Sequence, residues 1–152
     1  MTKMAGKIII NRSDMAINEA IAYDDEDLRQ IIMKKSILIV DDDIVSLKLA
    51  GMILSQGNYE IHRAKSGIDA IAFLKRQKVD LILLDIEMPM MNGIKTLEKM
   101  RSDNTMAKIP VIILTSSGEK ENVVSAARFG IVDYIKKPFV PNDLLERVWR
   151  AL

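Results

Sequence analysis

The sequence predicts an α/β domain in which a doubly wound, five-stranded parallel sheet is flanked by five helices. From residue 36 onward, short apolar runs alternate with amphipathic stretches, which is typical of repeated strand–helix units. Runs such as LILL at 81–84 are apolar at every position, as expected for strands that helices cover on both faces. With 152 residues, 49% of them hydrophobic, the chain is long enough for one such domain and an appendage.

The predicted elements alternate regularly along the chain. The expected strands are Ile37 to Val40, Glu60 to Ala64, Leu81 to Leu84, Val111 to Leu114 and Asp133 to Lys136. The expected helices are Ile44 to Gln56, Gly67 to Arg76, Gly93 to Arg101, Glu119 to Phe129 and Asn142 to Ala151. Gly57 and Gly130 come just past two helices, where a left-handed cap is favoured, and Pro141 stands just before the last helix.

Residues 1–35 precede this alternation, so we predict an N-terminal extension at 1–35 and a domain at 36–152. The extension contains KIIIN at 7–11, which suits a short strand, and then spaced apolar residues interrupted by YDDED at 23–27. Asp24 or Asp25 suits the cap of a second short helix. We expect a helical appendage used in association, for example in a homodimer; a disordered leader is the alternative.

Charge and composition exclude several classes of function. Lys and Arg number 22 against 21 for Asp and Glu, so the net charge near +1 offers no bulk attraction to nucleic acid or an anionic membrane. The absence of Cys excludes disulfides, thiol catalysis and thiolate metal sites. Neither a membrane-spanning run nor a secretory pattern is present, so we expect a cytoplasmic protein without membrane insertion or direct nucleic-acid binding.

Polar residues follow four of the predicted strands, at the edge where such sheets bind ligands. Asp41 and Asp42 follow the first strand, Asp85 the third, Thr115 the fourth and Lys137 the fifth. Two carboxylates ~4 Å apart repel by roughly 4 kcal/mol at an effective dielectric of about 20, so three together require a compensating cation. A hard ion such as Mg²⁺ suits carboxylate ligands, and Lys137 supplies further positive charge.

Each of these residues also has a purely structural explanation. Asp42 or Asp43 suits the N-cap of the following helix, and Asp85 can be an ordinary loop residue. Thr115 can satisfy the backbone, and Lys137 precedes a proline that restricts it to an extended conformation. Only the ordered set indicates a site.

Together the residues resemble the receiver domain of two-component response regulators, and in particular its single-domain, chemotaxis-regulator-like members. The resemblance covers about residues 36–152. It rests on the acidic pair Asp41–Asp42, on Asp85 within DIEMPMMNG at 85–93, on Thr115, on Tyr134 and on KPF at 137–139. Asp85 and Thr115 are 30 residues apart and Thr115 and Lys137 are 22 apart, as in that family. The resemblance implies the flavodoxin-like strand order 2-1-3-4-5.

The resemblance also implies a role for each residue. Asp85 is the expected phosphoryl acceptor, and the phosphohistidine of a sensor histidine kinase or histidine phosphotransfer protein is the donor. Lys137 and Thr115 are expected to bind phosphoryl oxygens. The implied ligands of Mg²⁺, or of Mn²⁺, are Asp42, Asp85, the backbone carbonyl of Glu87 and, through a water molecule, Asp41.

Thr115 and Tyr134 are the implied switch residues. Phosphorylation adds close to two negative charges, and the family responds by remodelling the face formed by its fourth helix, fifth strand and fifth helix. A downstream protein is expected to bind there; alternatively, Tyr134 is an edge-strand aromatic that never moves. Glu87 and Ser117 occupy positions that tune the phosphoryl lifetime. The resemblance therefore implies a signalling domain of a phosphorelay and not an enzyme, because such a domain catalyses only its own phosphorylation and dephosphorylation.

The same opening stretch carries the main alternative. VDDDIV at 40–45 also resembles haloacid dehalogenase-like, Mg²⁺-dependent phosphohydrolases, with Asp41 as nucleophile and Asp43 as general acid. That family requires a further acidic motif after the lysine, where only about 15 residues remain, and it leaves Asp85 unexplained. A flavodoxin-like cofactor binder is less suitable still, since acids after the first strand would repel a phosphate.

The sequence ends at VWRAL, 148–152, together with the last predicted helix. We therefore expect a stand-alone receiver that signals by contact or relays phosphate. A piece of a longer regulator or hybrid kinase is the alternative.

Overall fold

The computed structural model describes residues 34–88, 91–116 and 120–152, without the side chains of residues 120–122. The predictions made for residues 1–33 and for Ser117 concern positions outside these described residues. Within the described part of the chain, no helix is both long and apolar enough to cross a membrane.

All predicted strands and helices are present, and their ends differ from the predicted ends by at most two residues. The strands are β1 (Lys35–Val40), β2 (Tyr59–Ala64), β3 (Leu81–Asp85), β4 (Val111–Thr115) and β5 (Asp133–Lys136). The helices are α3 (Ile44–Leu54), α4 (Gly67–Arg76), α5 (Gly93–Ser102), α6 (Lys120–Ala127) and α7 (Pro141–Ala151).

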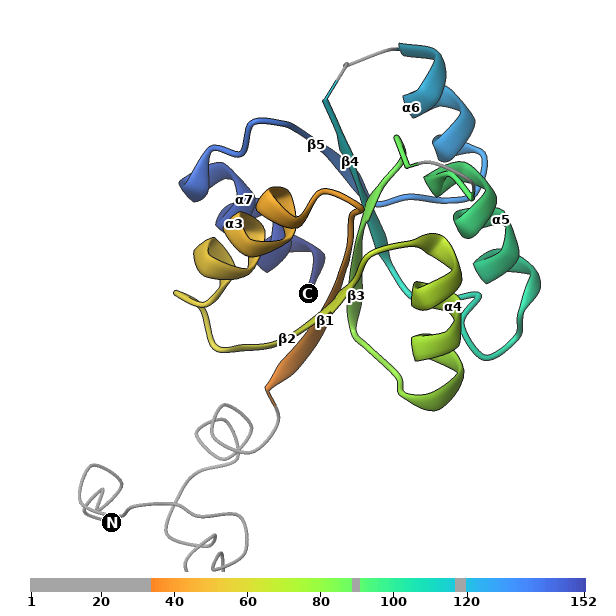
Figure 1. The fold of residues 1–152 in the computed structure, drawn as a ribbon, viewed down its shortest axis with the longest axis horizontal. Helices are drawn as coiled ribbons and strands as arrows, with labels where there is room; N and C mark the ends of the chain where they lie inside the picture. The colour runs from red at the N-terminus through yellow and green to blue at the C-terminus, as the bar shows by residue number, and fades with distance from the viewer. Residues whose placement is uncertain (1–33, 89–90, 117–119) are drawn as a thin grey trace, which may run out of the picture. The chain divides into compact units, whose positions relative to one another are not determined.

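The five strands form one parallel sheet in the order β2-β1-β3-β4-β5, which confirms the predicted topology. Helices α3 and α7 cover one face of the sheet, and α4, α5 and α6 cover the other (Figure 1). All residues of the central strands β3 and β4 are buried, because both faces of these strands lie under helices. The carboxyl ends of neighbouring strands therefore meet at one edge of the sheet.

The core is divided by the sheet into two apolar clusters. Leu38 and Val40 of β1 pack into the cluster that includes residues of α4 and α5, whereas Ile37 and Ile39 pack into the cluster beneath α3 and α7. This alternation follows from the two-residue repeat of a strand. The sheet is thus held from both sides, which gives the loops at its carboxyl edge a rigid base.

The three residues predicted at helix ends behave differently. Gly130 adopts the predicted left-handed conformation, with φ of 75°. The prediction for Gly57 is wrong: α3 ends at Leu54, and Gly57 N–H donates to the carbonyl of Leu54 in a tight turn. A Cβ at Gly57 would lie 2.5 Å from the ring of Tyr59, so the glycine admits that ring. Pro141 is the first residue of α7 rather than the residue before it, a position where no N–H is required.

Arg101 ties the ends of two helices to the loop between α5 and β4. Its guanidinium donates to the carbonyls of Phe129 and Gly130 after α6, at 2.7 and 3.5 Å, and to those of Ala107 and Ile109, at 3.0 and 2.9 Å. The last carbonyls of a helix lack partners within the helix itself. Arg101 therefore provides donors for the chain that leaves α6.

Candidate functional site

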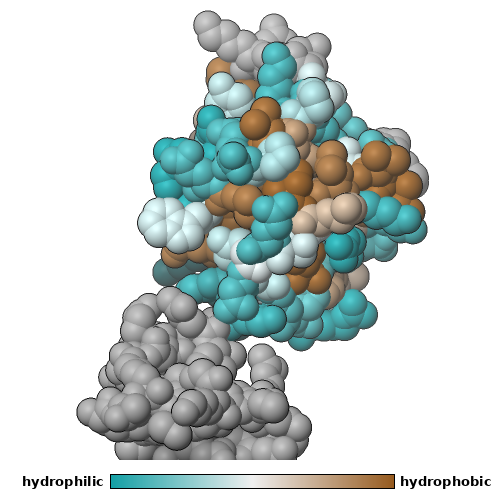
Figure 2. All heavy atoms as spheres, turned by 90° about the vertical axis from the view of Figure 1, so that its left-hand side faces the viewer, coloured by the Kyte–Doolittle hydropathy of each residue, from teal (hydrophilic) through white to brown (hydrophobic). Residues whose placement is uncertain are grey.

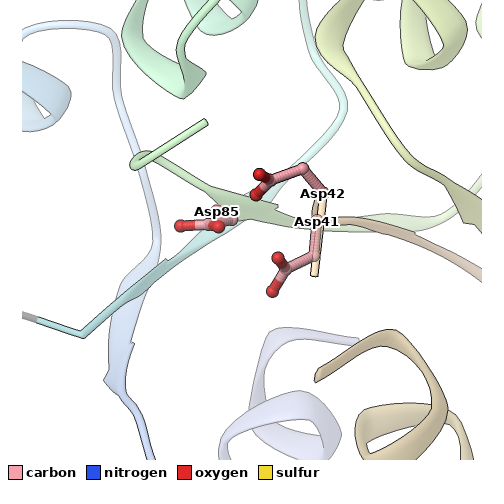
Figure 3. A group of neighbouring side chains, drawn as sticks. All are labelled: Asp41, Asp42 and Asp85. Atoms are coloured by element: carbon pink, nitrogen blue, oxygen red, sulfur yellow. The ribbon is translucent and has the colours of Figure 1, made fainter. Parts of the chain in front are cut away.

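Three carboxylates gather at the carboxyl edge of the sheet (Figure 3). Asp41 and Asp42 directly follow β1, and Asp85 is the last residue of β3. Because β1 and β3 are neighbours, both strands deliver their acids to one place. One oxygen from each carboxylate lies within 4.8 Å of the others. The structure thus brings together the three acids that we expected to share a site.

The three acids differ in exposure, and therefore in the free energy that is needed to ionise each carboxyl group. Asp41 is fully buried and Asp85 is 2% exposed, whereas Asp42 is exposed. Burial raises the pKa of Asp85 to about 6; the N–H of Glu87 opposes this rise, and repulsion from Asp41 adds to it. The site consequently favours the binding of positive charge.

Lys137 brings an ammonium group to the buried acids from the end of β5. Its Nζ lies 2.6 Å from Asp41 Oδ2 and donates a hydrogen bond to Asp85 Oδ2 at 3.3 Å. Burial lowers the pKa of Lys137, but the interactions with Asp41 and Asp85 outweigh burial, so the pKa is raised overall. The backbone N–H of Lys137 donates to the carbonyl of Thr115 at 2.7 Å, which ties the lysine to β4.

The loops after β1 and β3 orient their acids in the same way. Asp43 N–H donates to Asp41 Oδ1 at 2.9 Å, and Glu87 N–H donates to Asp85 Oδ1, also at 2.9 Å. Each bond engages one oxygen of the carboxylate. The other oxygen, Oδ2 in both residues, is the one that faces Lys137.

Gly93, the first residue of α5, allows this helix to begin against the backbone of the site. A Cβ at Gly93 would lie 2.4 Å from the carbonyl oxygen of Asp85 and 2.5 Å from the Cα of Ile86. The preceding Asn92 caps the helix, and its side chain accepts from the N–H of Lys95 at 2.9 Å. From the sequence we expected only that a helix begins at Gly93; the packing of Gly93 against Asp85 was not anticipated.

Thr115 and Tyr134 occupy different environments. Thr115 ends β4 beside β3; its side chain is fully buried, and its Oγ1 has no hydrogen-bond partner among the described residues. Such a hydroxyl is unusual in a folded protein and suits a site that binds a polar ligand. Tyr134 lies on β5 with 46% of its surface exposed.

Asp43 caps α3. Its side chain accepts from Val45 N–H and from Ser46 Oγ, both at 3.0 Å, and these bonds lower its pKa. This is the structural role that the sequence suggested for one of the three consecutive acids. The exposed, capping carboxylate is not held as a general acid, and the phosphohydrolase alternative has no support in the structure.

One contact at this edge was missed by sequence analysis. Glu87 Oε1 accepts from both the N–H and the Oγ of Ser116, each at 2.7 Å. The sequence drew attention to Glu87 and to Ser117, but not to Ser116. The only feature of the sequence that could have pointed to Ser116 is its position directly after Thr115.

The donor set fits the predicted metal ion. Mg²⁺ takes oxygen ligands and is commonly held by one or two carboxylates together with water. Among the described side chains, three carboxylates lie beside the ammonium group of Lys137 and leave excess negative charge, which an ion of this kind would balance.

Comparison with known proteins gives a consistent result. Residues 37–149 match the family model described as the response regulator receiver domain. The phosphate regulon transcriptional regulatory protein PhoB of Pseudomonas aeruginosa is 37% identical over 118 residues, which are 78% of this chain and 52% of that protein. The transcriptional regulatory protein SrrA of Staphylococcus aureus is 38% identical over 116 residues, 76% of this chain and 47% of that protein. This chain thus spans about half the length of these relatives.

Solved structures agree with this match. The chemotaxis protein CheY4 of Vibrio cholerae superimposes with a TM-score of 0.74 at 28% identity, over 78% of this chain and 99% of that one. A CheY-like receiver domain protein of Methanospirillum hungatei superimposes with a TM-score of 0.72 at 34% identity, over 77% of this chain and 92% of that one. The similarity therefore covers nearly all of the described residues.

Proposed function

Because this chain belongs to the response regulator receiver domain family of two-component signalling, we propose that it is a phosphorylation-dependent switch whose acceptor is Asp85. One observation carries the assignment of the acceptor. Asp85 is a buried carboxylate that lies within 4.8 Å of two other acids and accepts a hydrogen bond from Lys137. These residues lie at the ends of three separate strands, β1, β3 and β5, so the arrangement is a product of the fold.

The proposed reaction is a phosphoryl transfer to a carboxylate nucleophile. An oxygen of Asp85 attacks the phosphorus of a phosphohistidine, the P–N bond breaks, and the imidazole leaves with the electron pair and takes a proton from water. The product is an acyl phosphate. Hydrolysis returns the switch to its unphosphorylated state: water attacks the phosphorus, the Asp85 O–P bond breaks, and inorganic phosphate and the carboxylate are released.

Charge stabilisation is the main task of the protein in such a transfer. The Nζ of Lys137 donates to Asp85 Oδ2, which supports a role for Lys137 as donor to a phosphoryl oxygen. Thr115 has a buried hydroxyl available for another oxygen. Mg²⁺ or Mn²⁺ would be held by Asp42, Asp85, the carbonyl of Glu87 and, through water, Asp41. When bound, the ion neutralises charge on the transferring phosphoryl group.

The face beside the site suits a helical phosphodonor, a sensor histidine kinase or a histidine phosphotransfer protein. Figure 2 shows hydrophobic side chains gathered on the face that α3 and α7 form, and Ile44, Val45, Leu49 and Met52 of α3 are exposed there. A groove of about 480 Å³ runs from Val45 and Leu49 to Lys137, so a partner on α3 would lie next to the site. Val45→Glu should then slow phosphoryl transfer from a panel of phosphorylated kinases, but not from acetyl phosphate.

A second hollow lies between β5 and α7, two of the elements whose surface, together with that of α6, we propose for a downstream protein. It measures about 450 Å³ and is lined by Lys137, Tyr134, Arg147 and their neighbours. Tyr134 and Lys137 line the same hollow, which supports a change in the position of Tyr134 on phosphorylation. Thr115 and Tyr134 are our proposed switch residues.

Intact mass spectrometry after incubation with Mg²⁺ and acetyl phosphate tests the proposal directly. The wild-type chain should gain one phosphoryl group, and Asp85→Asn should gain none. If wild type shows no gain, binding of beryllofluoride separates rapid hydrolysis from an inactive site. Phosphorylation of Asp85→Asn to the wild-type extent would reject Asp85 as the acceptor.

A further inference from the structure

A hydrogen-bonded bridge joins the loops that follow β3 and β4. The carboxylate of Glu87, two residues after Asp85, accepts from the backbone N–H and from the hydroxyl of Ser116, each at 2.7 Å. Both distances lie within the ranges of charge-assisted bonds to a carboxylate, the N–H bond at the short end of its range and the hydroxyl bond at the long end. The bridge thus closes a contact between segments that are 29 residues apart in the chain.

Both ends of the bridge adjoin groups of the proposed phosphorylation site. Glu87 N–H holds Asp85 Oδ1 at 2.9 Å, and Ser116 directly follows Thr115, whose Oγ1 is buried and without a partner in the described structure. A phosphoryl group on Asp85 brings three strong acceptor oxygens. Lys137 and Thr115 offer side-chain donors for these oxygens, and the donors of Ser116 are taken by Glu87.

We propose that Glu87 is a positioning residue whose carboxylate competes with the phosphoryl group for Ser116, so that the bridge must open when Asp85 is phosphorylated. The inference rests on the proposed function of Asp85. Its physical basis is twofold. The Glu87 carboxylate and the phosphoryl group are both negatively charged and repel each other, and the N–H of Ser116 can donate a good hydrogen bond to only one of them. The closed bridge therefore favours the unphosphorylated loop and opposes acceptance of the phosphoryl group.

Three variants of Glu87 separate the bridge from a simple effect of charge. Glu87→Ala removes both the bridge and the charge. Glu87→Asp keeps the charge, but its side chain is shorter by one methylene and falls short of Ser116. Glu87→Gln keeps the length and an acceptor oxygen without the charge. Glu98→Gln, an exposed carboxylate on α5, is the matched control.

The affinity for beryllofluoride at saturating Mg²⁺, measured by calorimetry, is the first readout, and the rate of phosphorylation by acetyl phosphate is the second. We expect Glu87→Ala and Glu87→Asp each to bind about tenfold more tightly, Glu87→Gln to lie between them and wild type, and Glu98→Gln to be unchanged. The NMR signal of the Ser116 amide should shift in Glu87→Ala and Glu87→Asp, and a shift in the same direction should follow when beryllofluoride binds wild type.

The other outcomes identify which proposal fails. Wild-type affinity in Glu87→Ala and Glu87→Asp, with beryllofluoride still bound, would overturn the bridge alone. Tighter binding in Glu87→Ala and Glu87→Gln, with Glu87→Asp like wild type, would assign the effect to charge and also overturn it. A wild-type chain that neither binds beryllofluoride nor accepts a phosphoryl group would overturn the proposed function and the bridge with it.

Discussion

The ammonium group of Lys137 lies 2.6 Å from Asp41 Oδ2, so two residues far apart in the sequence form a largely buried ion pair at the site. The pair balances only part of the charge, because Asp85 Oδ2 lies 3.3 Å from the same ammonium group. Removal of the lysine would leave two buried carboxylates without a cation. That imbalance leads to the first prediction.

Lys137→Met should reduce the free energy of unfolding at pH 7.5 by about 2 to 4 kcal/mol without divalent cations, since it leaves buried carboxylates unpaired. Urea denaturation measures the change. Addition of Mg²⁺ should restore part of the lost stability, because the ion replaces the missing positive charge. Lys136→Met, at the exposed neighbouring position, is the control and should change stability little. An equally small loss in Lys137→Met would contradict the importance of the ion pair.

Asp85→Asn should make stability less dependent on pH. The folded pKa of Asp85 is raised to about 6, so without Mg²⁺ its ionisation opposes folding, and stability falls as the pH rises from about 4 through 6. The asparagine variant escapes this loss. It should be more stable than wild type by about 1 to 3 kcal/mol at pH 7.5 and equally stable below about pH 4.

Denaturation curves across this pH range provide the measurement, with Glu98→Gln as the control. A constant difference between Asp85→Asn and wild type from pH 4 to 8 would show that ionisation of Asp85 is not the cause.

Gly93→Ala should destabilise the domain by about 2 to 4 kcal/mol, because the new methyl group meets backbone atoms that side-chain movement cannot clear. It should also weaken beryllofluoride binding by displacing Asp85. Gly130→Ala is the matched control: its φ of 75° disfavours alanine by about 1 to 2 kcal/mol, but a Cβ there has no atom within 4 Å. Thermal unfolding and calorimetry check both variants; unchanged binding in Gly93→Ala would contradict its effect on Asp85.

Asp43→Ala should reduce stability by about 1 kcal/mol through loss of the N-cap of α3, and phosphorylation of Asp85 should continue. Chemical denaturation gives the first quantity and intact mass with acetyl phosphate the second. Asp43→Asn, which retains a capping oxygen, should be close to wild type in stability. Loss of phosphorylation in both variants would show that Asp43 takes part in the chemistry.

The topology was predictable from the sequence because it depends on features that repeat. Apolar runs such as LILL place strands in the core, and acids at their ends, Asp41 and Asp85, must then share one edge of a parallel sheet. The bridge from Glu87 to Ser116 could not be predicted, because it depends on side-chain conformations in two loops. Gly57 shows another limit: the local pattern favours a left-handed cap, but the ring of Tyr59 determines how α3 ends.

The bonds made by Arg101 restrict how α6 could move. Its guanidinium engages the carbonyls of Phe129 and Gly130, directly after α6, whereas the opposite end of this helix follows the loop that begins at Ser116. A translation of the whole helix would break the bonds at Phe129 and Gly130. A tilt about these two residues would keep them, and such a tilt would move the start of the helix, which follows Ser116 in the chain, more than its end.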